Sequence, residues 1–558
     1  MKTIDRYLGI ALMGLAFGSL AACTDHEEWD VDSSYGRLFG ATEDGISVTA
    51  AETSATVEFS ARQPKESNTG NIYYIIEVSK DSLYDDVEMG GENAIVYGED
   101  KSITSSPAEI TGLDGDTEYY LRLKVMSDTK KESRWSYYND GEPFETLAEQ
   151  LFIESEIVRG DTYIDLKWTP GAEVTHITVT ASDGTPAMDD IDLEQYPDAV
   201  ANGEYKVEPL TQMTTYVFTI YNGDVKRGEV TLTTAASMPD AEFKYTLPST
   251  VTVLSQDIID DVEQQALASG VTPESYSVTI GIPAGITLDV HGTDEETGDA
   301  TSIVIPDGMS VTFFGLAGGD APTLNVDKSI DLAGTHAYVR FENVKFVDTG
   351  GQYLINQSAA CTIGSDLSFT NCTLTDFERS FVRSQKPEVV INEVNVDNCI
   401  ATNMSHGNGY SVFFLKKNGG KINSLNITNS TFDTFQRSFI ELTKNDVGTA
   451  INISDCTFYN GAGNDKYIID TNESANATVS ITRCIFALSP AKLRGVRCAT
   501  DPVIAQVYFT SDFNLTASAF EPTQQLQVDA AGLFADPANH DFTLMDKDIE
   551  AGDPRWYQ

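Results

Sequence analysis

The stretch LSFTNCTL, residues 367–374, decides the fold because altered copies of it recur along the second half of the chain. The copies are VRFENVKF (339–346), VNVDNCIA (394–401), LNITNSTF (425–432), INISDCTF (451–458) and VSITRCIF (479–486). Their sixth residues, of which Cys372 is one, follow each other at spacings of 28, 27, 31, 26 and 28 residues. A period of this length predicts a repeat architecture.

Within each copy the first, third and eighth residues are apolar, and the fifth is Asn, Asp or Arg. The alternation predicts strands with one buried face, so we expect Phe369 and Ile453 to point inward in one stack. Asn suits a left-handed turn, and stacked Asn side chains can hydrogen-bond along the axis. We therefore expect a parallel β-helix over residues 239–558, with coils roughly 4.8 Å apart and one continuous core.

The segment SQDIIDDVEQQALASG, residues 255–270, predicts a helix that caps the first coil. Ile258, Ile259, Val262 and Ala266 fall on one helical face, with Ser255 before it and Gly270 after it. A cap is expected because the end of a solenoid exposes unpaired strand edges. The closing segment GLFADPANHDFTLMDKDIEAGDPRW (532–556) and SIVIPDGMSVTFFGLAGGDAPTLNV (302–326) resemble pectate-lyase-like β-helix proteins. The resemblance implies that the parallel β-helix is right-handed.

Two shorter modules precede the repeats. ITGLDGDTEYYLRLKV (110–125) resembles a fibronectin type III signature, and VEPLTQMTTYVFTIYNGD (207–224) matches it more weakly. Trp168 stands where that family keeps a core Trp. The expected fold class is thus all-β, with fibronectin type III-like β-sandwiches at 35–148 and 149–238 before the β-helix. Such modules usually act as spacers.

The N-terminus predicts a targeting segment, with Lys2 and Arg6 before an apolar run from Leu8 to Leu20. The run is too short to span a bilayer as a helix. It ends in LAAC, which resembles a bacterial lipoprotein signal (1–22) with Cys23 as the lipidated residue. The acidic residues 23–34 resemble the tether that directs lipoproteins of the Bacteroidota to the cell surface. We expect a lipid-anchored protein of the outer membrane, exposed at the cell surface.

After Cys23 six cysteines remain, and four of them share the sixth position of the repeat. Cysteines in adjacent coils could form disulfides, or they could remain buried thiols that pack as small apolar residues. There is no CxxC and no His spacing typical of a metal site. We assign no metal ligands and no catalytic residues, and we expect no cofactor unless the protein is a lyase.

The formal net charge is −49, but residues 340–500 hold 15 basic and 15 acidic residues. The rest of the chain therefore holds 21 of the 36 basic and 70 of the 85 acidic residues. Basic residues are thus relatively concentrated in the central coils. No nucleic-acid partner is expected from so acidic a chain.

Two copies of one motif lie in this neutral region: DFERSFVRS (376–384) and DTFQRSFIEL (433–442). They place Arg379 and Arg437 at the same repeat position two coils apart, roughly 10 Å. Arg suits bidentate capture of carboxylates. The predicted glycan-binding residues are Arg379, Arg383, Lys416, Lys417, Arg437 and Lys444, flanked by Phe381, Tyr410, Phe413, Phe414 and Phe439. Alternatively, the Phe residues belong to the core and the Arg residues pair with Glu378, Glu441 and Asp470.

These features predict a surface lipoprotein that binds an acidic polysaccharide, pectin-like or otherwise rich in uronate, with a glycan import complex as a further possible partner. The resemblance to surface lipoproteins of glycan-degrading Bacteroidota implies a polysaccharide utilisation system. One alternative is a polysaccharide lyase, with Arg383, Lys416 or Lys444 as base and Ca²⁺ held by Glu441 and Asp470. A second alternative is an adhesin-like stalk.

Overall fold

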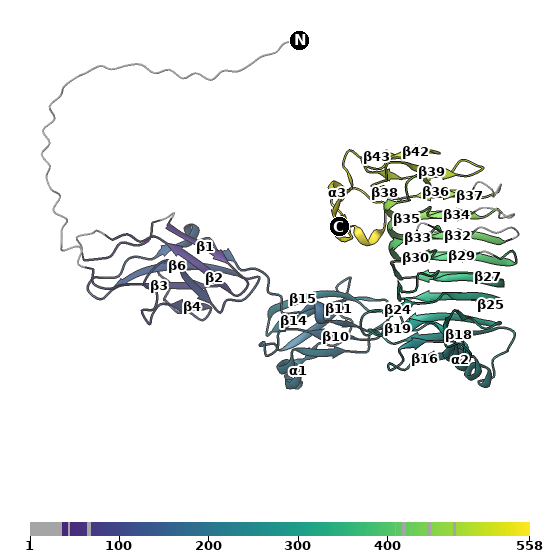
Figure 1. Cartoon of the computed structure of the whole chain (residues 1–558). Coiled ribbons are helices and arrows are strands. Elements are labelled where there is room, and N and C mark those ends of the chain that lie inside the picture. Colours follow the sequence, from purple (N-terminus) through teal and green to yellow (C-terminus); the bar gives the residue numbers. More distant parts are fainter. Residues whose placement is uncertain are drawn as a thin grey trace, which may run out of the picture.

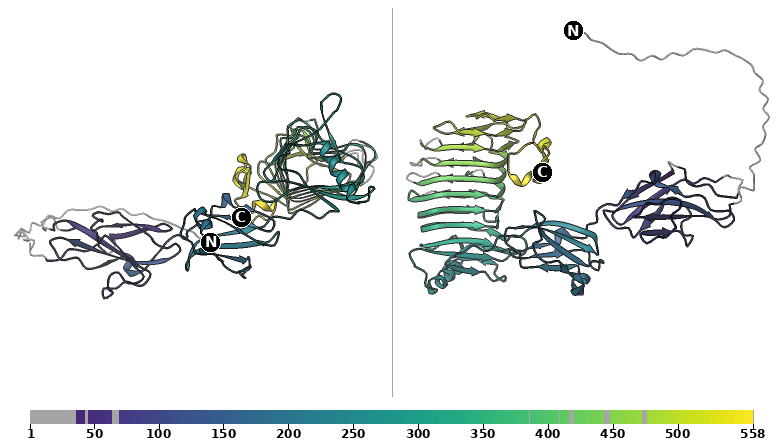
Figure 2. Two further views of the ribbon diagram at one scale, coloured as in Figure 1. Left: turned by 90° about the horizontal axis from the view of Figure 1, so that it is seen from below. Right: turned by 180° about the vertical axis from the view of Figure 1, so that it is seen from behind.

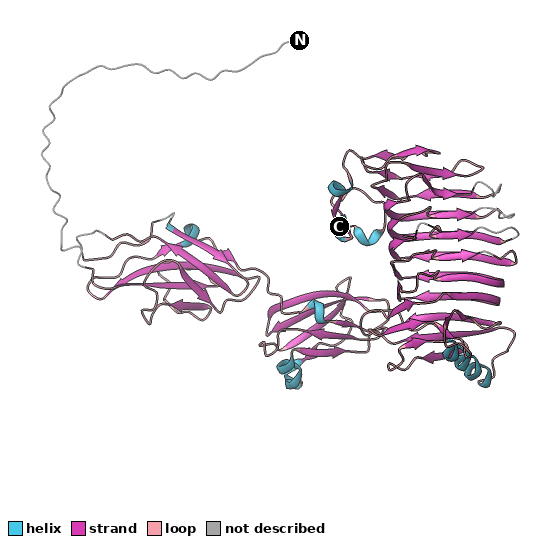
Figure 3. Ribbon diagram, in the orientation of Figure 1, coloured by secondary structure: helices cyan, strands magenta, loops and turns pink. Residues whose placement is uncertain are grey.

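The computed structural model describes residues 36–42, 45–63, 69–384, 386–407, 409–415, 420–442, 448–471 and 476–557. It confirms the expected fold class: the chain is mostly β, with two β-sandwiches followed by a β-helix (Figures 1 and 3). Seen along the stack, the coils superpose into one ring (Figure 2, left).

The first sandwich packs the sheet β1-β2-β5 against the sheet β4-β3-β6-β7, with β8 paired to β6. Its strands are β1 Ile46–Ala50, β2 Ser54–Phe59, β3 Ile72–Ser79, β4 Ala94–Tyr97, β5 Ala108–Thr111, β6 Glu118–Ser127, β7 Ser136–Tyr137 and β8 Phe144–Glu145. Alternation along β2 and β5 turns every second side chain into the shared core.

The second sandwich packs β13-β10-β9 against β12-β11-β14-β15. Its elements are β9 Val158–Arg159, β10 Ile164–Lys167, β11 His176–Ala181, β12 Ile191–Asp192, α1 Pro197–Asn202, β13 Glu204–Val207, β14 Thr215–Asn222 and β15 Val225–Thr233. Trp168 is buried in its core, as predicted.

The β-helix stacks its strands in three parallel sheets. The first sheet contains β16 Phe243–Thr246, β18 Tyr276–Ile282, β23 Met309–Gly315, β25 Ile330–Glu342, β27 Ile355–Thr370, β30 Val389–Asp397, β33 Lys421–Phe435, β35 Ala450–Gly461, β37 Thr478–Thr482 and β40 Val503–Ala505. Long strands such as β33 and β35 bend and continue into the second sheet.

The second sheet contains β17 Val253–Leu254, β19 Thr287–Val290, β24 Thr323–Val326, β26 Lys345–Asp348, β28 Thr373–Thr375, β31 Ile400–Met404, β38 Ile485–Ala487, β41 Tyr508–Phe509 and β43 Gln524–Gln525. The third contains β22 Ile303–Val304, the first residues of β25 and β27, β29 Val382–Ser384, β32 Phe413–Leu415, β34 Ile440–Leu442, β36 Lys466–Asp470, β39 Leu493–Arg497 and β42 Leu515–Ala517.

The core of the β-helix follows the repeat frame. Phe313, Phe341 and Phe369 form a stack with ring centroids 5.1 Å apart, and the stack continues through aliphatic residues to Ile453. Phe369 and Ile453 are buried, which confirms their predicted inward direction. The repeated cysteines are free and buried, and their thiols contact backbone carbonyls.

The fifth position of the repeat forms a turn with positive φ, as predicted. Asn343, Asn371, Asn398 and Asn429 have φ between 49° and 56°. The amide of Asn371 donates to Asn343, and the amide of Asn398 donates to Asn371, at 3.1 and 3.3 Å. Each turn therefore lies in register with the next along the axis.

The two ends of the repeat region differ, because a helix covers the first coil whereas the closing segment lies beside the coils. The helix α2, Gln256–Ala268, buries Ile259, Val262 and Ala266 as predicted, and the Ser255 hydroxyl accepts from the Ile258 N–H. At the other end, the segment with α3 Ala530–Leu533, β44 Phe534–Asp536 and β45 Asp541–Leu544 folds back beside the coils (Figures 1 and 2). Hydrogen bonds from Thr431 to Asp553 and from Trp556 to Thr431, both 2.8 Å, attach it to the second sheet.

Candidate functional site

The candidate site is the outer side of the third sheet, here called the site face. Figure 1 labels its strands β29, β32, β34 and β36 one above another. The strand alternation of β29 buries Val382 and Ser384 and turns Arg383 outward. Parallel pairing then aligns one residue from each coil: Asn356, Arg383, Phe414, Glu441, Asp470 and Arg497.

The repeated Arg-Ser-Phe motif enters this sheet from a turn. Phe381 and Phe439 are buried on either side of Phe413, with ring centroids 5.4 Å apart in both pairs. These three Phe residues therefore belong to the core and do not flank a glycan. Arg379 and Arg437 stand three residues before β29 and β34, and Phe413 of β32 pairs with both strands. They thus lie on one face two coils apart, as predicted.

Arginine and tyrosine side chains gather at the lower coils of the site face. The Arg383 guanidinium lies 4.3 Å from the Tyr353 ring centroid and 5.6 Å from that of Tyr410, and Arg379 lies 5.2 Å from Tyr353. Tyr410 meets the rings of Tyr353 and Phe414 edge-on, at 5.2 and 5.3 Å. Such cation–π contacts hold a guanidinium in place without neutralising its charge.

Burial and a hydrogen bond with Tyr410 raise the pKa of Tyr353 to about 12, against the opposing effect of Arg383. Tyr353 therefore remains a neutral hydrogen-bonding group over the physiological range. Arg383 also donates from Nη1 to Asn356 Oδ1 at 3.4 Å. A neutral aromatic ring therefore lies beside two positively charged guanidinium groups, those of Arg379 and Arg383.

Arg379 differs from the other arginines of the site face in its partners. Among the residues that the structure describes, its guanidinium contacts the Tyr353 ring and forms no hydrogen bond or ion pair. Its side chain is partly exposed. A partly exposed guanidinium held against an aromatic ring can receive a carboxylate from a ligand through two parallel N–H···O bonds.

Arg437, by contrast, is paired within the protein. Its Nε and Nη2 atoms each lie 3.2 Å from Glu441 Oε2, which also accepts from the Ser411 hydroxyl at 2.9 Å. Glu441 is buried, so the pair compensates a charge that would otherwise be costly. This pairing is one of the alternatives that the sequence left open.

The upper coils repeat the paired pattern. Arg497 donates to both carboxylate oxygens of Asp470, at 2.8 and 2.5 Å, and Arg494 donates to Asp465 at 3.0 and 2.6 Å. Tyr467 lies against both guanidinium groups, at 4.4 Å from Arg497 and 5.3 Å from Arg494. The hydrogen bond from Arg494 lowers the pKa of Tyr467, and both positive charges add to that effect.

Tyr353 and Tyr467 are thus counterparts in the repeat. Each stands two residues before the same register position of the third sheet. The ring of each contacts two arginines of the following coil. Neither tyrosine was predicted from the sequence, and neither were Arg494 and Arg497. A column count could have found Arg497, which follows Asp470 by 27 residues, the same spacing that separates Asn356 from Arg383.

Several predicted residues cannot be placed. Lys416, Lys417, Lys444 and Cys23 lie outside the described residues. Glu441 and Asp470 are neighbours in register, as their spacing predicted. Both carboxylates, however, accept from arginines. Within the described parts of the chain, no group of three or more His, Cys, Asp and Glu side chains could hold a metal ion.

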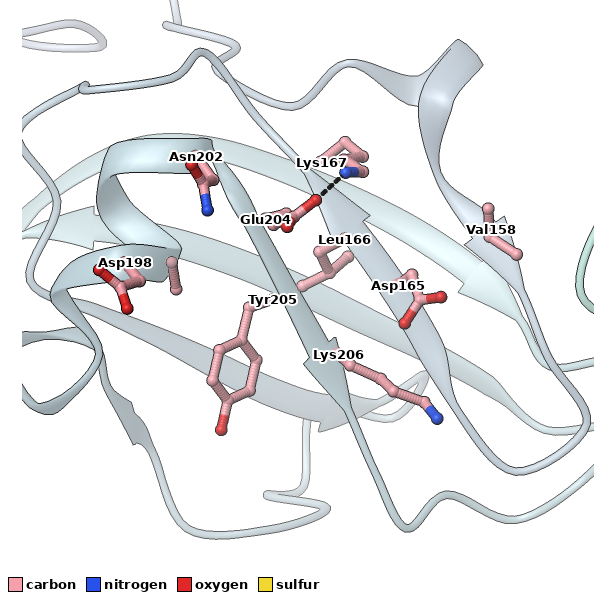
Figure 4. A pocket seen from close by; sticks show the side chains of 10 residues that line it. Val158, Asp165, Leu166, Lys167, Asp198, Asn202, Glu204, Tyr205 and Lys206 are labelled. Carbon is pink, nitrogen blue, oxygen red and sulfur yellow. Dashed lines mark hydrogen bonds and ion pairs between the residues drawn. The ribbon is translucent and has the colours of Figure 1, made fainter.

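A separate hollow lies on the second sandwich, beside α1 and β13 (Figure 4). It has a volume of about 460 Å³ and is lined in part by Asp165, Lys167, Glu204 and Lys206. Its charges are matched, because Lys167 pairs with Glu204 and Lys206 with Glu208. Burial raises the pKa of Asp165.

Two families match the β-helix. The family described as Domain of unknown function (DUF4957) matches residues 301–434, and the family described as Domain of unknown function (DUF5123) matches residues 451–556. A comparison with curated proteins finds no match. The site face spans both families, since Arg379 lies in the first match and Arg497 in the second.

Among solved structures, the two-domain fibronectin type III segment from chicken tenascin is 16% identical, with a TM-score of 0.20. The match covers 34% of this chain and 95% of that one. The FN1–FN3 domains of chicken CNTN1 are 11% identical, with a TM-score of 0.14, covering 36% of this chain and 66% of that one. Within the described ranges, no helix is long and apolar enough to cross a membrane.

Proposed function

We propose that this protein binds an acidic polysaccharide through the site face. The observation that carries the proposal is Arg379, a partly exposed guanidinium held against the Tyr353 ring without a carboxylate partner among the described residues. A carboxylate such as that of a uronate residue matches the planar donor geometry of an arginine. Tyr410 and Phe414 supply aromatic surface beside it.

The solenoid suits a polymeric ligand better than a small one. Successive coils place side chains at intervals of roughly 4.8 Å, so the face presents a line of groups along which an extended chain can lie. The sandwiches precede the β-helix in the chain and would act as spacers. Lipidation at Cys23 would hold the whole at the outer membrane, where a glycan import complex could take over the bound chain.

Affinity electrophoresis tests the proposal. Wild type should be retarded in gels that contain polygalacturonate, alginate or hyaluronan, and retardation should weaken with salt because exposed charges are screened over about 8 Å at physiological ionic strength. Arg379→Ala should lose most of the retardation, while Lys345→Ala, on strand β26 of the second sheet, serves as the matched control. If wild type migrates unhindered in every acidic glycan, the stalk becomes the better explanation.

A further inference from the structure

The loop that joins β3 to β4 in the first sandwich, residues 80–93, presents apolar side chains to solvent. Three of them stand close together in the chain: Tyr84 is 62% exposed, Val87 37% and Met89 42%. The same loop contains five acidic residues and a single basic one. Its tip therefore combines exposed apolar surface with an excess of negative charge.

Most of this negative charge is not compensated within the part of the chain that the structure describes. The carboxylates of Asp81 and Asp85 accept hydrogen bonds from two neutral groups, an amide and a phenol. The loop's one basic side chain, Lys80, pairs with Asp114 outside the loop. No hydrogen bond or ion pair to a described residue engages the side chains of Asp86, Glu88 and Glu92. The loop thus leaves several carboxylates free to attract a cationic surface.

A buried ion pair holds the loop in place. The Arg122 guanidinium of β6 lies 2.7 Å from the Glu77 carboxylate of β3, and both side chains are fully buried. The two terminal nitrogens of Arg122 donate to the carbonyl oxygens of Tyr84 and Val87, at 2.6 and 2.9 Å. The second oxygen of Glu77 accepts from the Gly90 N–H at 2.8 Å. One ion pair therefore fixes the loop at three points.

The ion pair is better explained by the loop than by the core. Burying two charges carries a desolvation cost, and apolar residues of similar volume often stabilise a protein equally well. What Arg122 supplies here is a set of directed bonds to the loop backbone, and the Trp135 ring, 4.2 Å from the guanidinium, holds it in position. A loop fixed in advance loses little conformational freedom when a partner binds.

We propose that the tip of this loop, residues 84–89, is a docking site for another protein, whose surface combines basic side chains with an apolar pocket. Exposed Tyr and Met are typical of protein interfaces, and a few such residues contribute most of the binding energy. The free carboxylates select a basic partner by charge complementarity. An acidic glycan would be repelled, so this site is separate from the site face and does not depend on the proposed function. A second copy of the chain, with a formal net charge of −49, is opposed as well.

Photo-crosslinking in the cells that produce the protein tests the proposal. In the full chain, p-benzoylphenylalanine would replace Tyr84 or, as a control, Tyr196, which is 45% exposed on the second sandwich. Position 84 should give a discrete protein adduct that position 196 does not give, and mass spectrometry would identify the partner. The proposal is overturned if no such adduct forms, or if the adduct is a second copy of this chain or a glycan.

Binding kinetics with the purified partner separate the two parts of the site. Tyr84→Ala should weaken binding about 30-fold, the factor that 2 kcal/mol at an interface hot spot produces, mainly through faster dissociation. Asp86→Asn with Glu88→Gln should slow association and reduce its dependence on salt. The matched control is Asp189→Asn with Asp190→Asn, two exposed acids of the second sandwich. Unchanged affinity in Tyr84→Ala, or equal slowing by both charge variants, would show that the loop is not the docking site.

Discussion

The two arginines of the repeated motif should differ in their effect on stability. In Arg437→Ala, Glu441 loses two contacts of 3.2 Å to its guanidinium partner while remaining buried. A hydrogen bond to a charged group contributes about 1.5–3 kcal/mol. Both contacts share one oxygen and the Arg437 side chain is 23% exposed, so we expect a loss of about 2 kcal/mol.

Arg379→Ala removes a partly exposed contact with the Tyr353 ring, 5.2 Å away. Cation–π contacts of this kind contribute about 0.5–1 kcal/mol. Urea unfolding followed by circular dichroism would compare the two variants, with the m-value checked for constancy. The motif alone predicts equal effects, whereas the structure predicts that Arg437→Ala is the more destabilising.

A second substitution identifies the cause. Glu441→Gln in the Arg437→Ala background replaces a buried charge with a neutral amide of similar shape, so part of the lost stability should return. Wild type, Arg437→Ala, Glu441→Gln and the double variant form a double-mutant cycle. This cycle isolates the coupling energy between the Arg437 and Glu441 side chains. Equal destabilisation by the two arginine variants, or no recovery with Glu441→Gln, would refute the reasoning.

Four further outcomes are expected. Phe369→Ala should cost about 3–5 kcal/mol by opening a cavity in the stacked core, and an unchanged urea midpoint would contradict the packing. In ¹³C-tyrosine NMR, the resonance lost in Tyr467→Phe should titrate with a pKa below the usual 10.0, and the resonance lost in Tyr353→Phe with a pKa near 12. The reverse order of these two pKa values would contradict the described contacts. Because the lowered pKa of Tyr467 favours the folded phenolate, its added stability should be present above pH 10 and vanish as pH falls through the folded pKa. Cys23→Ala should release the protein from membranes, and a variant that stays membrane-bound would exclude the lipid anchor.

The core of the β-helix was predictable because its pattern is local and periodic. The first and third positions of each repeat must be apolar to bury one face of a strand, and a turn with positive φ favours Asn. Leu367, Phe369 and Asn371 behave accordingly. Burial and backbone conformation depend mainly on a residue's immediate neighbours in the chain, so a single repeat already contains most of the information.

The partners on the site face were not predictable from that pattern. Arg379 and Arg437 occupy equivalent positions, yet Glu441 stands where Arg383 stands two coils earlier. That one difference gives Arg437 an ion pair and leaves Arg379 on a tyrosine ring. Likewise, the rings of Tyr353 and Tyr410 come into contact only because the folded chain places their separate coils close together.

The chain's repeats therefore determine the layers, the inward columns and the turns, since these follow from alternation and from the conformational preference of Asn. The coil-to-coil register and the direction of long side chains determine which charges remain available to a ligand. An arginine side chain is long enough to reach several neighbours, and the choice among them depends on the coils above and below it. Only the assembled β-helix brings those coils together.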